Sequence, residues 1–205
     1  MTTLVMFSGG LDSTAVLIRL LTETQDQLRV HHIRMHNKEA RAEAEQLAVE
    51  RIVTWCRRHH RSFDYSESGL DFSSLSAIPI DFVSVAFVAC QVAIDTPRCD
   101  RIAVGTLARD LDEMKRSVCT SQRKVFEAMY QCYRARKLGD PALEWIYPVY
   151  AMSKAQIASM LVPELRDLTW SCRRPVKAGA KFLACGRCKP CLARKEVSTA
   201  LELAP

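Results

Sequence analysis

The sequence has no stretch that could cross a membrane and no segment typical of a secretion signal. No apolar run approaches the roughly 20 residues that a transmembrane helix needs. The first residues carry neither a positively charged region nor a signal-like apolar core, so export is not expected. Internal repeats and low-complexity tracts are also missing. These absences argue against a membrane or secreted protein, and a cytoplasmic location is expected.

The composition is that of a globular chain with a moderate positive charge. The 205 residues, 48% of them hydrophobic, can bury one core and leave room for a small appendage. The formal net charge is +6 and the isoelectric point is about 8.9. This charge suits anionic partners such as nucleotides or RNA, although lysine and arginine often only solvate a surface.

Two common nucleotide-binding motifs are missing, but another glycine-rich loop is present. The chain has no Gly-Lys-Ser/Thr of a Walker A loop and no GxGxxG of a dinucleotide site. It has FSGGLDST at 7–14, between an apolar run and a helical pattern. A strand, a glycine-rich turn and a helix start bind phosphate, because the turn amides and the helix dipole face the anion.

The residue types of this loop suit a phosphate site. Gly9 and Gly10 permit the tight turn and a close approach of the anion. Asp12 can hold Mg²⁺. Hydroxyl donors can come from Ser8, Ser13 and Thr14. The alternative is an ordinary turn between a strand and a helix with an aspartate near the helix start.

Apolar periodicity alternates between strands and helices up to residue 168. Strands are expected at 3–7, 28–35, 62–65, 101–105 and 145–147. Helices are expected at 12–21, 37–60, 81–94, 118–137 and 153–161, the third capped by Asp81 and the last by Ser153. This alternation predicts an α/β fold with a doubly wound parallel sheet. From Thr169 onwards Gly, Pro, Arg and Cys replace the pattern, which predicts domains at 1–168 and 169–205.

Four of the nine cysteines have the spacing of a metal site. Cys185, Cys188 and Cys191 form C-x2-C-x2-C, and Cys172 lies upstream across a loop. Four thiolates suit a structural Zn²⁺ and leave no open position for catalysis. An iron–sulfur cluster and plain reduced thiols are the alternatives. Nearby cations that would offset the negative charge are Arg187, Lys189 and Arg194. The other cysteines are scattered: Cys56, Cys90, Cys99, Cys119 and Cys132. Of these, Cys56 and Cys90 lie in helical patterns and are expected as core or surface thiols.

The loop and the cysteine motif together resemble one enzyme family. The strand–SGGxDS–helix start is similar to the pyrophosphate (PP) loop of the ATP pyrophosphatases, which adenylate a substrate oxygen and release pyrophosphate. TWSC at 169–172, followed by Cys-Gly-x-Cys-x-x-Cys-x-x-Arg at 185–194, resembles the 7-cyano-7-deazaguanine (preQ0) synthases. YPVYAMSKAQIASM at 147–160 and DRIAVGT at 100–106 match further segments of that family. The resemblance therefore spans the chain.

This resemblance implies an ATP-dependent ligase of queuosine biosynthesis with an adenine nucleotide α-hydrolase-like, Rossmann-like fold. In that family 7-carboxy-7-deazaguanine becomes an acyl adenylate, and ammonia displaces AMP to give the amide. A second ATP activates the amide, and loss of AMP leaves the nitrile. Mg²⁺ and loop amides would stabilise the departing pyrophosphate. A homodimer is also implied.

The same resemblance assigns site residues. Nucleotide-binding residues would be Phe7, Ser8, Gly9, Gly10, Leu11, Asp12, Ser13, Thr14 and Gly105. Asp12, Ser13 and Lys154 would be catalytic, with Lys154 reaching a phosphate or the adenylate. For Lys154, a solvated lysine in the first turn of a helix is an equal alternative.

Three stretches depart from the family pattern. They are Met35–Glu39, Ile78–Asp81 and Asp110–Arg116, and the last two should line the substrate at the carboxyl edge of the sheet. A deazaguanine presents N–H and amino donors, which carboxylates accept well, so Asp81, Asp110 and Asp112 are substrate candidates. A helix cap for Asp81 and exposed loop charges for the other two are the alternatives. The changed lining leaves room for an enzyme that stops at the amide or uses another amine.

Histidines gather at the end of the second strand. His31, His32 and His36 suggest a metal, but neighbours on a strand point to opposite faces, so packing or solvent is favoured for His31 and His32. Met35 and His36 could border the adenine because they follow that strand.

The second class of function considered is a tRNA-modifying enzyme that adenylates a base in RNA. The residues that would grip RNA are Arg173, Arg174, Lys177, Lys181, Arg187 and Lys189. Neither the catalytic cysteine pair of a thiolating enzyme nor an added RNA-binding domain is evident, so direct nucleic-acid binding is not expected.

Overall fold

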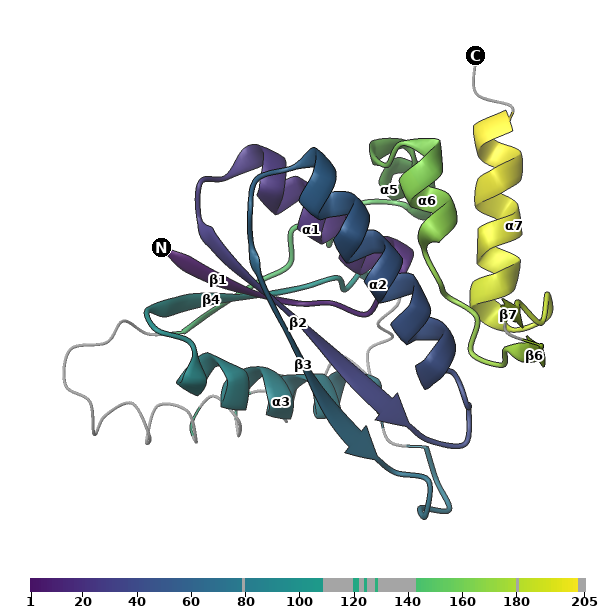
Figure 1. Ribbon diagram of the computed structural model, residues 1–205, viewed down its shortest axis with the longest axis horizontal. Helices are drawn as coiled ribbons and strands as arrows, with labels where there is room; N and C mark the ends of the chain where they lie inside the picture. The colour runs from purple at the N-terminus through teal and green to yellow at the C-terminus, as the bar shows by residue number, and fades with distance from the viewer. Residues whose placement is uncertain are drawn as a thin grey trace.

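A parallel sheet forms the centre of the computed structural model, which describes residues 1–78, 80–108, 120–121, 124, 128, 143–179 and 181–202. Its strands are β1 (Thr2–Met6), β2 (Gln27–His36), β3 (Asp64–Asp71), β4 (Cys99–Val104) and β5 (Glu144–Ile146). They lie in the order β3-β2-β1-β4-β5, and every neighbouring pair is parallel (Figure 1). The strand order reverses between β1 and β4, and ligands bind at such a reversal in open parallel sheets.

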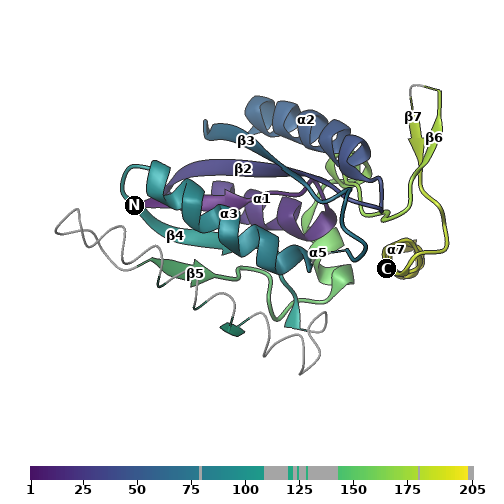
Figure 2. The same cartoon turned by 90° about the horizontal axis from the view of Figure 1, so that it is seen from below.

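Helices cover both faces of this sheet. On one face lie α1 (Leu11–Glu23) and α2 (Ala42–His59), and on the other lies α3 (Asp81–Asp95) (Figures 1 and 2). Side chains alternate between the faces along each strand. On β1, Val5 packs in the core with α1 and α2, whereas Leu4 packs in the core with α3. The predicted doubly wound sheet is therefore confirmed.

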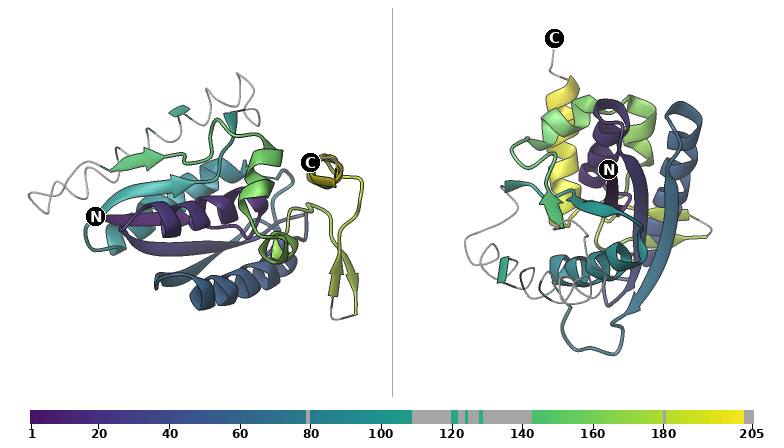
Figure 3. Two further views of the ribbon diagram at one scale, coloured as in Figure 1. Left: turned by 90° about the horizontal axis from the view of Figure 1, so that it is seen from above. Right: turned by 90° about the vertical axis from the view of Figure 1, so that its left-hand side faces the viewer.

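The last part of the chain gathers at the carboxyl end of the sheet. Its elements are α5 (Lys154–Met160), α6 (Pro163–Leu168), the antiparallel hairpin β6 (Val176–Ala178) with β7 (Lys181–Leu183), and α7 (Lys189–Glu202). Figure 3 shows the hairpin extending away from the sheet and α7 standing beside α5 and α6. Direct contacts of α5 with both α1 and α7 join this part to the body.

Most expected elements form, and the differences have local causes. The helix expected from residue 37 begins only at Ala42, because the Asn37 side chain accepts the Glu39 amide at 2.9 Å and Ala40 is left-handed at φ 51°. The third strand is longer than expected and pairs with β2 from Asp64 to Asp71. Its polar, half-exposed sequence hides it from an analysis based on apolar runs.

The two predicted helix caps have different outcomes. Ser153 does cap α5, and its hydroxyl and the Gln156 side chain form a reciprocal capping box. Asp81 is not a cap, because Ile80 holds that position and Asp81 is already the first helical residue. Of the helix expected at 118–137, most residues lie outside the described part of the chain. The hairpin, α6 and α7 were not predicted.

Among the helices in the described ranges, none combines the length and apolarity needed to span a bilayer.

Candidate active site and metal centre

The glycine-rich loop joins β1 to α1 in the arrangement of a phosphate site. Gly10 is the N-cap of α1 and has no side chain to bind the amides of the first turn. Those amides have no acceptor within the helix, so an anion placed there would accept their hydrogen bonds and meet the positive end of the helix dipole. Gly9 has φ 71°, a conformation that only glycine adopts without strain.

Hydrogen bonds of the loop's own hydroxyl groups stabilise its shape. The Ser8 and Ser13 oxygens lie 3.0 Å apart, and the Ser8 amide donates to the Ser13 hydroxyl at 3.2 Å. The Thr14 hydroxyl donates to the Gly10 carbonyl at 2.8 Å, and Thr14 is fully buried. The buried hydroxyl of Thr14 therefore fixes the backbone at Gly10, while the Ser8–Ser13 contact joins the two ends of the turn.

Two glycines are required by close packing around the loop. A Cβ at Gly9 would lie 2.9 Å from a methyl of Val49 on α2. A Cβ at Gly105, directly after β4, would lie 2.8 Å from the Ser13 amide nitrogen and 3.0 Å from the Asp12 carbonyl carbon. The expected site residue Gly105 is therefore beside the start of α1, where its lack of a side chain lets strand and helix approach.

Asp12 and Lys154 meet at the start of α1. The Lys154 ammonium, from the first turn of α5, donates to the Asp12 carboxylate. Their side chains are only 20% and 19% exposed. Lys154 is therefore not a freely solvated lysine, because it is mostly buried and paired with Asp12.

Trp170 connects the glycine-rich loop to residues 169–202, which carry the four cysteines and are called the cysteine segment below. Its amide donates to the Gly9 carbonyl at 2.9 Å, and its indole N–H donates to the Cys172 carbonyl at 3.0 Å. One residue thus contacts both the glycine-rich turn and a metal-ligand candidate. Sequence analysis assigned no role to Trp170, although its place in the TWSC motif was the available signal.

The two neighbouring histidines of β2 point to opposite faces, as expected, and both are buried. The His31 ring lies between the hydroxyls of Ser66 at 2.8 Å and Ser68 at 2.9 Å. The His32 ring bonds the Phe7 carbonyl at 2.8 Å, so it supports the first residue of the loop. Burial lowers the pKa of both rings, that of His31 to about 4. Both histidines serve packing and loop support.

An ion-pair cluster occupies the carboxyl edge of the sheet beside the loop. Arg41 contacts Glu39 at 2.9 Å, Glu45 at 3.1 Å and Asp81 at 2.8 Å, and Arg173 contacts Asp81 at 2.9 Å. Burial raises the pKa of Glu45 to about 7. One carboxylate oxygen of Asp81 accepts hydrogen bonds from the guanidinium groups of both Arg41 and Arg173. Its other oxygen is buried and has no hydrogen-bond donor among the described residues.

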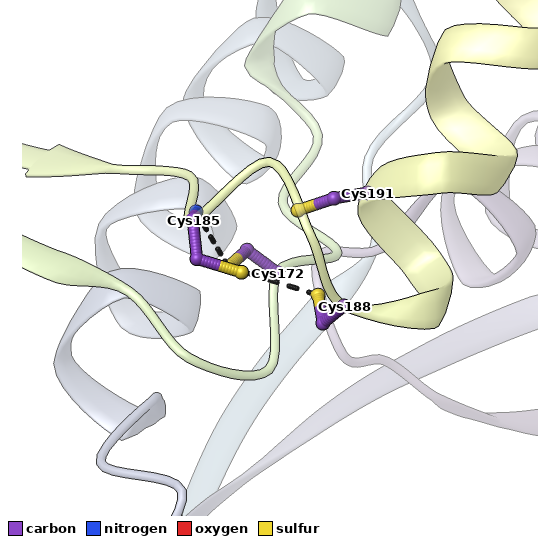
Figure 4. Close-up of side chains that lie close together, drawn as sticks. All are labelled: Cys172, Cys185, Cys188 and Cys191. Carbon is purple, nitrogen blue, oxygen red and sulfur yellow. Dashed lines mark hydrogen bonds between the residues drawn. The ribbon is translucent and has the colours of Figure 1, made fainter.

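The four cysteines of the predicted metal site converge (Figure 4). Their sulfur atoms all lie within 4.8 Å of one another, and Cys172 and Cys188 are 4.0 Å apart. Gly186 at φ 70° turns the chain between the ligands. The Cys185 and Arg174 amides donate to the Cys172 sulfur at 3.2 and 3.4 Å. Amide donation from Arg187 lowers the pKa of Cys185 to about 6, so this thiol readily becomes a thiolate.

The size of the cysteine cluster fits a single metal ion. Metal–sulfur bonds of about 2.3 Å at tetrahedral angles place the four sulfurs roughly 3.8 Å apart. A four-iron cluster binds each cysteine at a different iron atom and holds the sulfurs farther apart. The donor set therefore fits one tetrahedral ion once the sulfurs move slightly closer together.

The remaining candidates divide between the core and the part outside the described residues. Cys56 and Cys90, expected as core or surface thiols, are buried, and so is Cys99. Asp110, Asp112, Cys119 and Cys132 lie outside the described residues. Lys177, one of the residues that would grip RNA, pairs with Glu43 at 3.1 Å.

These features define the class of fold: a doubly wound parallel sheet with a glycine-rich loop after β1 and a C-terminal four-cysteine cluster. The chain has this fold in common with the U34-tRNA thiolase NcsA from Methanococcus maripaludis, solved with its 4Fe-4S cluster. The TM-score is 0.52 at 18% identity, over 98% of this chain and 64% of NcsA. The chain thus spans less than two thirds of that protein.

Other comparisons add no family assignment. A predicted subunit of tRNA methyltransferase from Methanocaldococcus jannaschii matches with a TM-score of 0.40 and 17% identity, over 78% of this chain and 73% of that one. That similarity is too low to support an argument. No protein-family model matches the chain, and no curated protein matches its sequence. The preQ0 synthase family stays a prediction from the motifs.

Proposed function

We propose that this protein is an ATP-dependent enzyme that adenylates an oxygen of its substrate and releases pyrophosphate. The observation that carries the proposal is the loop at 7–14, with the Asp12–Lys154 pair at the start of α1. The uncapped amides of α1 would hold the phosphates. Nearby cations stabilise charge that develops on a departing pyrophosphate.

Asp12 and Lys154 have complementary tasks in this proposal. Mg²⁺ in nucleotide sites is held by one or two carboxylates together with the phosphates, and Asp12 supplies a carboxylate of that kind. When bound, the ion neutralises phosphate charge and acts as a Lewis acid. Lys154 would then exchange its bond to Asp12 for a phosphate oxygen. The ion pair in the structure holds both side chains ready for that exchange.

For the substrate we propose 7-carboxy-7-deazaguanine, with ammonia or another amine as the second reactant. The motif resemblance supports the acid, and the adenylated carboxylate lets oxygen leave as AMP. Asp81 supports recognition of the base, because its second carboxylate oxygen is buried without a donor among the described residues. A deazaguanine N–H or amino group would supply that donor. A homodimer remains part of the proposal.

The test is mass spectrometry of the base after incubation with ATP, Mg²⁺ and ammonium. The proposal expects conversion of the acid to the amide or the nitrile, with formation of AMP. Asp12→Asn should lower conversion by roughly 10²-fold or more because the metal loses its carboxylate. Asp95→Asn is the matched control, since Asp95 is the last residue of α3, is 77% exposed and pairs with Arg29 among the described residues. Unchanged acid under all conditions would exclude this substrate.

For the cysteine cluster we propose a structural Zn²⁺ held by four thiolates. The short sulfur separations support one ion, and four protein ligands leave no position for a substrate. The metal would serve to fix the Trp170–Cys172 segment against the glycine-rich loop.

RNA modification is the second candidate function, and the distribution of charge favours it. Residues 169–205 contain eight lysines and arginines against two glutamates, a net charge of +6 that equals the charge of the whole chain. The structural similarity to a tRNA thiolase also supports this candidate. Filter binding of tRNA in 50 mM and 200 mM salt separates the two functions. Submicromolar, salt-sensitive binding would favour RNA, and its absence would favour the free base.

A further inference from the structure

A cavity of about 290 Å³ lies between the start of α1, helices α5 and α6, and α7 of the cysteine segment. Three cationic side chains line it, Lys154, Arg166 and Arg194, against the single carboxylate of Asp167. Hydroxyl groups in its wall come from Thr169, Ser171 and Ser198. The Thr169 and Ser198 hydroxyls already donate to the Arg166 and Arg194 carbonyls. The lining therefore binds an oxyanion mainly through its excess positive charge.

The cavity adjoins the glycine-rich loop. Leu11 is the first residue of α1 and Lys154 is the partner of Asp12, and both line the cavity. The Ser171 hydroxyl oxygen lies 4.0 Å from the position of a Cβ on Gly10. An anion bound to the first turn of α1 would therefore extend towards Arg166 and Arg194.

Arg194 is held rigidly at the cavity wall. Its guanidinium donates to the Thr169 carbonyl at 2.7 Å and to the Arg166 carbonyl at 3.2 Å. A guanidinium has five N–H groups, so these bonds fix its plane and leave donors for a ligand. Arg194 follows Cys191 by one helical turn on α7, so the metal ligands determine where this arginine lies.

We propose that this cavity receives the pyrophosphate end of ATP, with Arg166 and Arg194 as anion-binding residues from outside the glycine-rich loop. The inference rests on the proposed ATP-dependent function and extends its site into the cysteine segment. The bridging oxygen between the α- and β-phosphates takes the electron pair when pyrophosphate leaves, and fixed guanidinium groups stabilise that charge. The metal site thereby holds one wall of the nucleotide site.

Calorimetry with inorganic pyrophosphate and Mg²⁺ tests this inference without turnover. The proteins are the metal-loaded wild type, Arg166→Gln, Arg194→Gln and the control Lys195→Gln. Lys195 is the exposed neighbour of Arg194 on α7 and does not line the cavity. Each cavity variant should raise the Kd for pyrophosphate by about tenfold or more, as expected for loss of a charge-assisted contact. AMP binding and the control should stay within about twofold of the wild type.

Several outcomes would overturn the inference. One is an unchanged Kd for pyrophosphate in both cavity variants. Another is weaker binding of 7-carboxy-7-deazaguanine with normal binding of pyrophosphate, which would make the cavity a carboxylate site. If Arg194→Gln lost its metal or its fold, Arg166→Gln alone would decide. The proposed function has a separate test, because it fails if the protein converts ATP to ADP and phosphate. That result would not change the measured Kd values for pyrophosphate.

Discussion

Single residues hold the glycine-rich loop in place through contacts on every side. His32 bonds the Phe7 carbonyl, Trp170 donates to the Gly9 carbonyl, and Gly105 lies against the backbone of the first turn of α1. None of these three would bind ATP through its side chain in the proposed function. They keep the amides in position before the ligand arrives, which lowers the cost of ordering the site on binding.

Gly105→Ala should distort the glycine-rich loop, although residue 105 lies outside it. The new Cβ would lie 2.8 Å from the Ser13 nitrogen, so strand and helix must move apart. We expect a loss of roughly 1–3 kcal/mol in the free energy of unfolding, the usual range for overpacking, together with weaker ATP binding. Denaturant unfolding and calorimetry measure the two effects.

Gly69→Ala is the matched control for this substitution, because the nearest atom to its Cβ is the Arg34 carbonyl at 4.0 Å. Equal stability of the two alanine variants would contradict the packing account of Gly105.

His31 should make the stability of the fold depend on pH. Burial, and then the nearby Arg29, lower the pKa of His31 from 6.5 to about 4. Between these values the unfolded chain binds a proton that the folded protein excludes, so the free energy of unfolding falls as the pH falls from 6.5 to 4. Urea titrations across this range should show a shallower decline for His31→Asn than for the wild type. Parallel curves would show that this imidazole does not contribute.

At the scale of elements, the order of strands and helices was predictable, and the contacts between distant segments were not. β1 and α3 are predominantly apolar segments, α1 has apolar residues at helical spacing, and the glycine-rich loop and the cysteine spacing mark their sites directly. Asp81 shows which contacts the sequence could not predict. Its charge was visible as a candidate, but its partners Arg41 and Arg173 come from two other segments, and only the fold brings the three together.

Short elements escaped prediction for a related reason. β6, β7 and α6 span few residues and bury little, so their sequences carry no clear period. The turn before α2 was hidden too, because it depends on one hydrogen bond from the Glu39 amide to the Asn37 side chain and on a left-handed Ala40. Such features follow from single side chains and not from a repeating pattern.

Cys188→Ser should release the metal and loosen the hairpin and α7. Metal binding supplies folding free energy to small segments that bury little apolar surface, and here the four ligands join 172 to 191. We expect less than half of the wild-type zinc content by elemental analysis and faster proteolysis between 173 and 202.

Cys56→Ala provides the control for that variant, because Cys56 is a buried core thiol of α2 and belongs to no metal cluster in the described part of the chain. Full zinc in Cys188→Ser, or iron with a visible absorption band in the wild type, would contradict a four-thiolate zinc site.

Across the whole molecule, the carboxyl edge of the sheet brings the glycine-rich loop and the four-cysteine segment together. The loop comes from the first residues, Lys154 from α5, and the cysteine segment returns to contact Gly9 through Trp170. The start of the segment with the chain's net positive charge therefore lies beside the glycine-rich loop. This arrangement is what an enzyme that binds ATP and expels pyrophosphate requires at one place.

The most direct test of the central claim follows oxygen from the acid into the nucleotide. The metal-loaded protein is incubated with ATP, Mg²⁺, ammonium and 7-carboxy-7-deazaguanine labelled with oxygen-18 in its carboxyl group. If the carboxylate is adenylated, ammonia expels AMP with a labelled oxygen, and mass spectrometry finds oxygen-18 in AMP and unlabelled pyrophosphate. Formation of ADP and phosphate, or of AMP without label, would contradict adenylation of this acid at the glycine-rich loop.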